Sequence, residues 1–182
     1  MRIFAYCTQP AAAMVEKAVG VRPLVSPPLR AAMLDPVQLE GYDFLYFRLH
    51  GDPRIPDEWL GESHTRELVP AIWRNQIMTA DLSGAVVLLA NCYGASSPMA
   101  QEMYRSGAAV VIGGYGPNYA AGKSLRGADL LAKWLLAGLR NDFPPRAALI
   151  LAKGKLAMTA HRRSTRDTLK FKIINRSNSN EQ

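Results

Sequence analysis

A cysteine and a histidine each follow a strand-like apolar run. His50 comes directly after residues 43–49, which are rich in aromatic side chains, and Cys92 comes just after the wholly apolar residues 85–90. Because parallel strands end at the same edge of a sheet, we expect the two side chains to lie close together. An imidazole beside a thiol stabilises the thiolate and can later protonate a leaving amine. The pair therefore has the two parts of a cysteine nucleophile.

Glycines stand close to both of these residues. Gly51 follows the histidine, and its main-chain N–H can reach a substrate with no side chain in the way. The main-chain N–H of Cys92 is the second candidate donor. Two such donors would hold the oxyanion that develops when a thiolate attacks a carbonyl group. Gly94 allows the chain to turn sharply just after the cysteine.

The other cysteine and the other histidines fit this chemistry less well. Cys7 lies at the end of the first predicted strand, and a buried structural role is common for such a cysteine. His64 stands in a polar stretch, and His161 is followed by two arginines. We expect both of these histidines to be solvated.

Strand-like and helix-like segments alternate along the chain. The central runs, residues 85–90 and 108–112, are apolar throughout, as in strands that are covered on both faces. We therefore predict a three-layer α/β fold with a mainly parallel central sheet flanked by helices. The other predicted strands are residues 2–6, 21–25, 43–49 and 167–174. The predicted helical segments are 11–19, 36–41, 98–106, 123–140 and 145–162, with a helix start at 79–82; residues 52–66 and 113–122 are predicted loops, and 68–78 fit no single type.

The composition is that of one folded domain. The chain has 182 residues, of which 48% are hydrophobic and 20% are charged, so a substantial core is expected. We predict a single domain over residues 1–174 and a disordered polar tail over 175–182. No run approaches the roughly 20 apolar residues of a membrane span, and the first residues lack the apolar stretch of a signal peptide. With two cysteines, too few for a disulfide framework, we expect a cytoplasmic location and no membrane partner.

The formal net charge is +7, and much of the excess lies late in the chain. Aromatic residues do not alternate with these charges as in a platform for stacking bases, so nucleic acid is not an expected partner. A solvated face is the common role of such a run, and recruitment of a protein partner is the alternative. The basic residues concerned are Arg162, Arg163, Arg166, Lys170, Lys172 and Arg176.

Taken together, these residues resemble the caspase-like cysteine peptidases of clan CD, a group that includes caspases, gingipains, separases and bacterial CHAT domains. The shared features are a strand followed by His50-Gly51 and a later strand followed by Cys92 in a Cys-x-Gly motif. The histidine precedes the cysteine by 42 positions (92 − 50). Residues 99–112, a helix that leads through Ser-Gly-Ala into an apolar strand, are similar to CHAT domains in particular. The resemblance covers roughly residues 43–174.

The resemblance implies a cysteine endopeptidase that cleaves a protein or peptide through a thioester acyl-enzyme. It implies His50 as the acid and base, Cys92 as the nucleophile, and the main-chain N–H groups of Gly51 and Cys92 as the oxyanion hole. We predict no cofactor and no metal ion for this reaction. The candidate substrate pocket comprises Asp52, Asn91, Tyr115 and Asn118.

Two positions depart from the usual pattern of that family. Asn91 precedes the nucleophile where Ala or Ser is common, and Tyr115 stands near the place where CHAT domains often have Trp. The loop 113–124, which helps to wall the pocket in relatives, has one lysine and no carboxylate for a basic substrate side chain. A preference for Arg or Lys at the scissile bond therefore stays open, since other carboxylates follow the histidine. These are Asp52, Asp57 and Glu58.

Two other functions compete with a peptidase. The sequence around Cys92 is similar to the Gly-x-Cys-x-Gly elbow of class I glutamine amidotransferases, but position 90 is Ala. The family's His-x-Glu motif is also missing, since the only downstream histidine, His161, precedes two arginines. The second alternative is a caspase-like adaptor or regulatory domain without activity, because a fold does not dictate a function.

Two further motifs fail on their spacing. Gly116 and Gly122 are separated by five residues, whereas the phosphate-binding P-loop needs four. Pro117 also removes one N–H group from a loop that would bind phosphate through such groups. Ser96 is not in a Gly-x-Ser-x-Gly elbow, because Pro98 occupies the last position.

Overall fold

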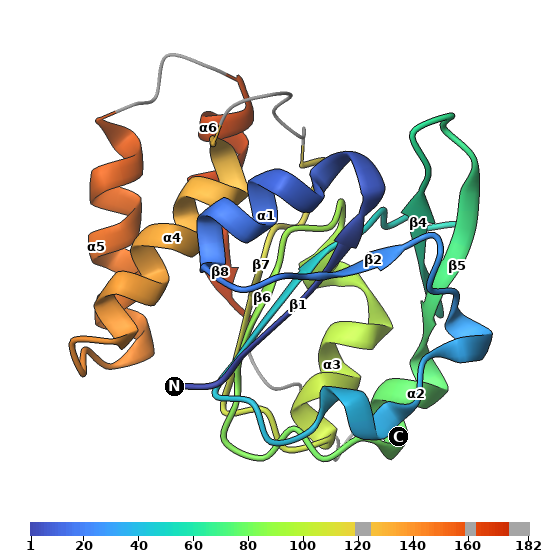
Figure 1. The fold of residues 1–182 in the computed structure, drawn as a ribbon. Helices are drawn as coiled ribbons and strands as arrows, with labels where there is room; N and C mark the ends of the chain where they lie inside the picture. Colours follow the sequence, from blue (N-terminus) through green and yellow to red (C-terminus); the bar gives the residue numbers. More distant parts are fainter. Residues whose placement is uncertain (119–124, 159–162, 175–182) are drawn as a thin grey trace.

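The computed structural model describes residues 1–118, 125–158 and 163–174. Its central strands are β1 (Ile3–Thr8), β2 (Leu24–Ser26), β3 (Phe44–Arg48), β6 (Val86–Leu89), β7 (Val110–Gly113) and β8 (Lys172–Ile173). They form one six-stranded sheet in the order β2-β1-β3-β6-β7-β8 (Figure 1). Neighbouring strands are parallel except for β7 and β8, which are antiparallel. The predicted α/β fold with a mainly parallel sheet is confirmed.

Helices cover both faces of this sheet. They are α1 (Ala12–Val19), α2 (Arg74–Thr79), α3 (Pro98–Arg105), α4 (Gly127–Leu139), α5 (Pro145–Ala157) and α6 (Arg163–Thr168). On one face lie α1 and α4, with α5 and α6 packed against α4, while α2 and α3 cover the other face (Figure 1). Short 3-10 helices occupy Gln9–Ala11, Ala31–Met33, Pro36–Leu39 and Gly94–Ser96. The three predicted layers are therefore present.

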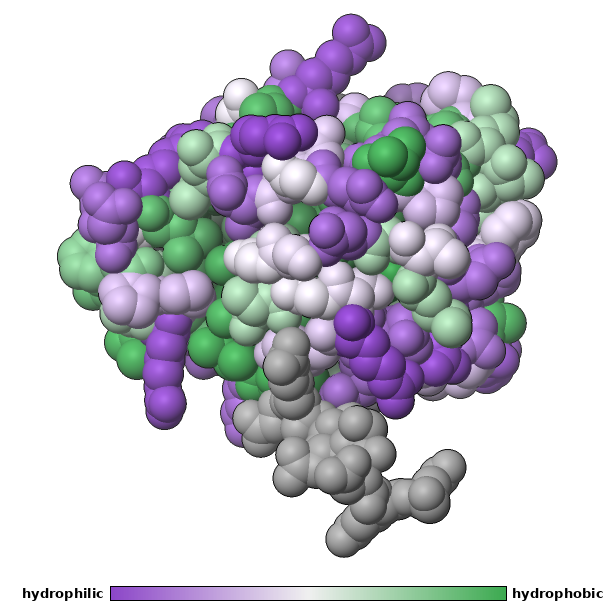
Figure 2. Space-filling model, turned by 90° about the horizontal axis from the view of Figure 1, so that it is seen from below, coloured by the Kyte–Doolittle hydropathy of each residue, from purple (hydrophilic) through white to green (hydrophobic). Residues whose placement is uncertain are grey.

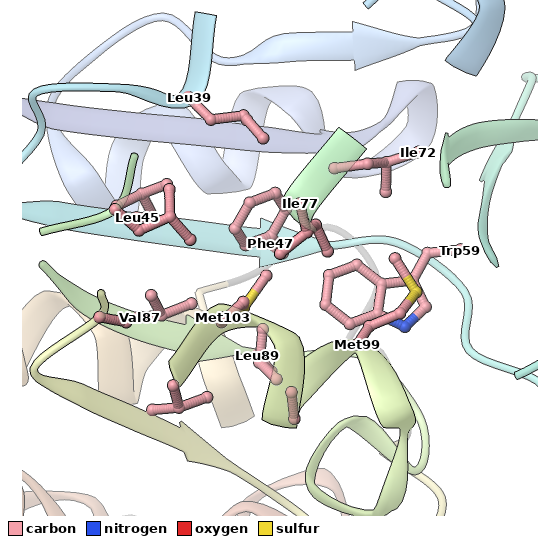
Figure 3. Close-up of a cluster of buried hydrophobic side chains, with 14 of the residues drawn as sticks. Leu39, Leu45, Phe47, Trp59, Ile72, Ile77, Val87, Leu89, Met99 and Met103 are labelled. Carbon is pink, nitrogen blue, oxygen red and sulfur yellow. The ribbon is translucent and has the colours of Figure 1, made fainter. Parts of the chain in front are cut away.

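Strand β3 is buried on both of its faces. Leu45 and Phe47 point to the side of α3, and Phe44 and Tyr46 point to the side of α4, all four with no exposed surface. Phe47 packs against Trp59 with ring centroids 5.5 Å apart, in the apolar cluster that Figure 3 shows. Burial on both faces explains the unbroken apolar run in the sequence. Because β3 is held on both faces, the position of the segment that follows it, which includes His50, is also fixed.

A buried ion pair ties the end of β3 to α4. The side chain of Arg48 is 10% exposed and lies 2.9 Å from Oδ2 of Asp129, which is 1% exposed. The hydroxyl of Tyr46 donates to Oδ1 of Asp129 at 2.8 Å. Burial raises the pKa of Asp129, and the nearby Arg48 charge opposes that effect. An unpaired charge in this buried position would lower the stability of the fold. The ion pair therefore holds the first turn of α4 against β3.

The predicted loop over residues 52–66 is wrong in its second half. Strand β4 (Glu58–Glu62) pairs there with β5 (Leu68–Trp73) in an antiparallel hairpin. Along β4, Trp59 and Gly61 are buried. The alternate residues of this strand are half-buried, which is the alternation of a strand with one covered face. The prolines and charges just before β4 conceal that short alternation in the sequence.

Two predicted elements near α2 change. Residues 68–78, which fit no single type, contain β5 and most of α2. The helix start predicted at 79–82 is wrong, because α2 ends at Thr79. The buried carboxamide of Gln76 fixes this helix by donating to the carbonyl oxygens of Ala31 and Leu34. Such a distant polar contact leaves no local pattern in the sequence.

The predicted last strand over residues 167–174 is also wrong in its first part. Residues up to Thr168 belong to α6, and only Lys172–Ile173 pair with β7. Thr165 and Thr168 are buried three positions apart, as on one face of a helix. The apparent period of two in the sequence combines a helix end, a turn and a short strand.

Residues 119–124, 159–162 and 175–182 lie outside the described part of the chain. The last residues of the predicted loop 113–122, the first residues of the predicted helix 123–140, the end of the predicted helix 145–162 and the predicted tail therefore fall there. Within the described ranges, α4 begins at Gly127 and α5 ends at Ala157. In those ranges, none of the helices combines the length and the apolar character that a membrane crossing needs.

The edge at which the strands begin is the one seen in Figure 2. Hydrophilic side chains surround smaller hydrophobic areas on this face. Because β3 and β6 run away from it, His50 and Cys92 lie toward the opposite edge of the sheet.

Candidate active site

Strands β3 and β6 end side by side at one edge of the sheet. Phe47 pairs with Leu89 in parallel register, and the N–H of Ala90 donates to the carbonyl of Phe47 at 2.8 Å. His50 and Cys92 each lie three residues beyond the Phe47–Leu89 pair. The sheet therefore places the two predicted catalytic residues at equivalent positions beyond the ends of two neighbouring strands.

Gly51 packs directly against Cys92. A Cβ atom added at Gly51 would lie 2.1 Å from the carbonyl oxygen of Cys92, so a larger residue cannot fit without moving the backbone. Among the described residues, neither Gly51 nor Cys92 has an acceptor for its main-chain N–H. Both groups remain able to donate to a substrate oxygen, which is what an oxyanion hole requires.

A carboxylate holds the imidazole of His50. Nε2 of His50 lies 2.7 Å from Oε2 of Glu62, the last residue of β4. The main chain of His50 is also fixed, because its N–H and carbonyl bond to Leu60 at 2.8 and 2.9 Å. The side chains of His50 and Glu62 are 45% and 24% exposed, so the pair is open to solvent. The hairpin orients the imidazole and leaves it accessible.

The sequence did not indicate Glu62 as a functional residue. It stands 12 positions after His50, in a stretch that was expected to be a loop. The signal was present in the alternation of β4, which puts Glu58, Leu60 and Glu62 on one face. The bridge between His50 and Leu60 then brings this face of β4 to the imidazole.

The segment after β7 folds over the cysteine. The N–H of Asn118 donates to Sγ of Cys92 at 3.2 Å, and the thiol lies 3.5 Å from the carbonyl oxygen of Asn118. Tyr93 has a φ of 55°, in the left-handed region, and its N–H donates to the carbonyl of Gly116 at 2.9 Å. Both main-chain polar groups of Asn118 thus contact the sulfur of Cys92.

A small cavity of about 80 Å³ opens beside the cysteine. Of the predicted site residues, Gly51, Asp52 and Cys92 line it together. His50 is not among the residues that line this cavity. The rest of the lining is Pro53, Pro56, Glu58, Trp59, Tyr93, Ser96, Ser97 and Pro98.

The other predicted pocket residues surround the cysteine without lining this cavity. Asn91 is fully buried, and its Oδ1 accepts the N–H of Leu49 at 3.1 Å. Nδ2 of Asn118 donates to the carbonyl of Ala90 at 2.6 Å. Tyr115 is 54% exposed at the surface. Asn91 thus ties the segment before Cys92 to the residue before His50, and Asn118 ties the segment after β7 to the end of the run that leads to Cys92.

The carboxylates closest to the cavity already have partners. Asp52 accepts hydrogen bonds from the main chain and the guanidinium of Arg54, which lower the pKa of Asp52 to about 2. Glu58 accepts a hydrogen bond from Nε1 of Trp73 at 3.2 Å. Within the described ranges, no three His, Cys, Asp or Glu side chains are arranged to hold a metal ion.

The second cysteine has a different environment. Cys7 is fully buried in β1, and burial raises the pKa of its thiol to about 12. At neutral pH this thiol is protonated and out of reach of solvent. Cys92, by contrast, is partly exposed. A structural role for Cys7 agrees with its position.

Comparisons with known proteins relate this fold to one class. No family model matches the chain, and no curated protein matches it. Among solved structures, the fold is that of caspase-like cysteine proteinases. The chain is similar to the crystal structure of the Arg-specific cysteine proteinase gingipain R, with a TM-score of 0.58 and 12% sequence identity. The match covers 94% of this chain and 45% of that one, so the chain spans less than half the length of this neighbour.

Proposed function

We propose that this protein is a cysteine endopeptidase of clan CD, most similar in its motifs to the bacterial CHAT domains. The observation that carries the proposal is the placement of His50 and Cys92 at equivalent positions beyond a register pair of neighbouring strands. The caspase-like fold of the chain and its cysteine proteinase neighbour support it. The N–H of Asn118 at Sγ and the carboxylate of Glu62 at the imidazole are the contacts that such a pair needs.

In the proposed reaction, Sγ of Cys92 attacks the carbonyl carbon of a peptide bond. The carbonyl oxygen becomes an oxyanion, which the N–H groups of Gly51 and Cys92 would stabilise. His50, which has taken the proton of the thiol, gives that proton to the nitrogen of the leaving amine as the C–N bond breaks, and a thioester between Cys92 and the acyl part of the substrate remains. A water molecule, deprotonated by His50, attacks the thioester, releases the acid and restores the thiol.

Glu62 has the role of a positioning residue in this scheme. Its contact with Nε2 fixes the plane of the imidazole and stabilises the charge that forms when His50 takes up a proton. It touches neither the substrate nor the sulfur in the proposed reaction.

The proposal is tested with a library of peptides from a digested proteome, with new termini identified by mass spectrometry. We expect the native chain and the Cys7→Ala variant to cut the same peptides, and Cys92→Ala to cut none. Cleavage that persists in Cys92→Ala would exclude this mechanism. Release of ammonia from glutamine, without peptide cleavage, would favour the amidotransferase, and absence of both activities would favour the adaptor.

A further inference from the structure

A larger groove adjoins the cavity beside Cys92. Its volume is about 730 Å³, and it lies between the segment before β4 and the junction of β5 with α2. Pro56 and Glu58 line both hollows, so the groove and the cavity share a wall. The full lining is Ile55, Pro56, Asp57, Glu58, Trp73, Arg74, Asn75 and Met78.

Large apolar side chains provide the open surface of this groove. Trp73 is 37% exposed and Met78 is 56% exposed, and both border the same hollow as Ile55. Large apolar side chains that border a concave site are typical of surfaces that bury a ligand. A ligand side chain of similar character would remove all three from water.

The charged groups of the walls are paired with their neighbours. Asp57 lies 3.3 Å from the guanidinium of Arg74, which also binds Glu102 at 2.9 Å. Glu58 accepts a hydrogen bond from the indole of Trp73 at 3.2 Å, and the main-chain N–H of Arg74 donates to the carbonyl of Asp57 at 2.8 Å. These contacts fix the walls and satisfy their charges. The groove therefore recognises apolar surface rather than a charge.

We propose that this groove binds a bulky apolar side chain of the peptide substrate, at a position outside the two residues that flank the scissile bond. This inference rests on the proposed endopeptidase function and adds the substrate class to it. An extended peptide advances about 3.3 Å per residue, so a chain that passes Cys92 reaches the shared wall at Pro56 and Glu58 within a few residues. Leu, Met, Phe and Trp are the side chains that the groove would select.

Binding is measured separately from cleavage by using the full chain with Cys92→Ala and a displayed library of random peptides. We expect selected peptides to share one large apolar residue at a fixed position. Adding Met78→Lys, which puts a charge into the groove, should weaken binding of these peptides by about tenfold or more. The matched control is Ile150→Lys on α5, a residue that is 63% exposed and away from the groove, and it should leave binding unchanged.

The inference is overturned if no peptide is selected, if the selected peptides share no apolar residue, or if Met78→Lys binds them as well as Ile150→Lys does. The native chain is then given the same peptides. Peptides that bind through an apolar residue but are never cut would support the groove and count against the peptidase. Peptides that are cut without any apolar preference would support the peptidase and exclude the groove.

Discussion

In the proposed mechanism, the contact between His50 and Glu62 decides which imidazole nitrogen exchanges the proton. Because Nε2 is held by the carboxylate at 2.7 Å, Nδ1 is the nitrogen that remains to exchange a proton. On the sulfur side, the N–H of Asn118 donates to Sγ of Cys92 at 3.2 Å. The side chain of Glu62 on β4 thus contacts the imidazole, and the main-chain N–H of Asn118 after β7 contacts the sulfur.

Replacing Glu62 by Gln keeps a hydrogen-bonding group beside His50 and removes the negative charge. We expect peptide cleavage and alkylation of Cys92 both to fall by about 10- to 100-fold, because the protonated imidazole loses its ionic partner. The two rates are measured across pH 5–9. Glu62→Asp should restore part of the loss, whereas unchanged rates in Glu62→Gln would show that the contact only supports the hairpin.

At the scale of elements, the ends of β3 and β6 carry the site, and three other elements complete it. The β4–β5 hairpin brings Glu62, the segment after β7 brings Asn118, and α4 holds the end of β3 through Asp129. The Arg48–Asp129 pair lies on the face of the sheet away from the hairpin and fixes the strand that leads to His50.

The variant Asp129→Ala removes the buried carboxylate that pairs with the guanidinium of Arg48 and accepts the hydroxyl of Tyr46. We expect the free energy of unfolding to fall by about 3–5 kcal/mol, as measured by urea denaturation. Glu16→Ala, which removes an exposed carboxylate from α1, serves as the control and should change that energy by less than about 0.5 kcal/mol. Equal losses in the two variants would mean that the buried pair contributes little to stability.

An element could be predicted from the sequence where its burial leaves a local pattern of apolar residues. β3 and β6 are covered on both faces, so their apolar runs stand out, and with them the edge that carries His50 and Cys92. The hairpin and α2 were missed because their burial depends on partners that are distant in sequence: Trp59 packs on Phe47, and Gln76 binds the carbonyl of Ala31. Glu62 was missed for the same reason.

At the scale of the whole molecule, two apolar clusters pack on opposite faces of one sheet. Alternate residues of β3 belong to each cluster, so neither cluster can lose its order without disturbing the other. The chain spans 45% of the length of its gingipain neighbour. The shared sheet supports the proposal that residues 1–174 form one folding unit.

This arrangement predicts a single cooperative unfolding transition. In a Cys92→Ala variant that also carries Trp73→Phe and Trp134→Phe, the buried Cys7 reacts with a thiol reagent only when the layer of α1 and α4 opens, while Trp59, then the remaining tryptophan, reports on the opposite layer. We expect the thiol reaction, tryptophan fluorescence and circular dichroism to give the same denaturation midpoint. Two separate midpoints would show that the layers unfold independently.

The central claim is that His50 activates the thiol of Cys92, and the rate of alkylation of that thiol tests it most directly. The native chain, His50→Ala and the control His64→Ala are treated with iodoacetamide at pH 7, and the modified cysteine is identified by mass spectrometry. We predict that Cys92 reacts faster than a short cysteine-containing peptide in the native chain and in His64→Ala. We also predict that His50→Ala lowers this rate by about tenfold or more. An equal rate for Cys92 in His50→Ala and in the native chain would contradict the account.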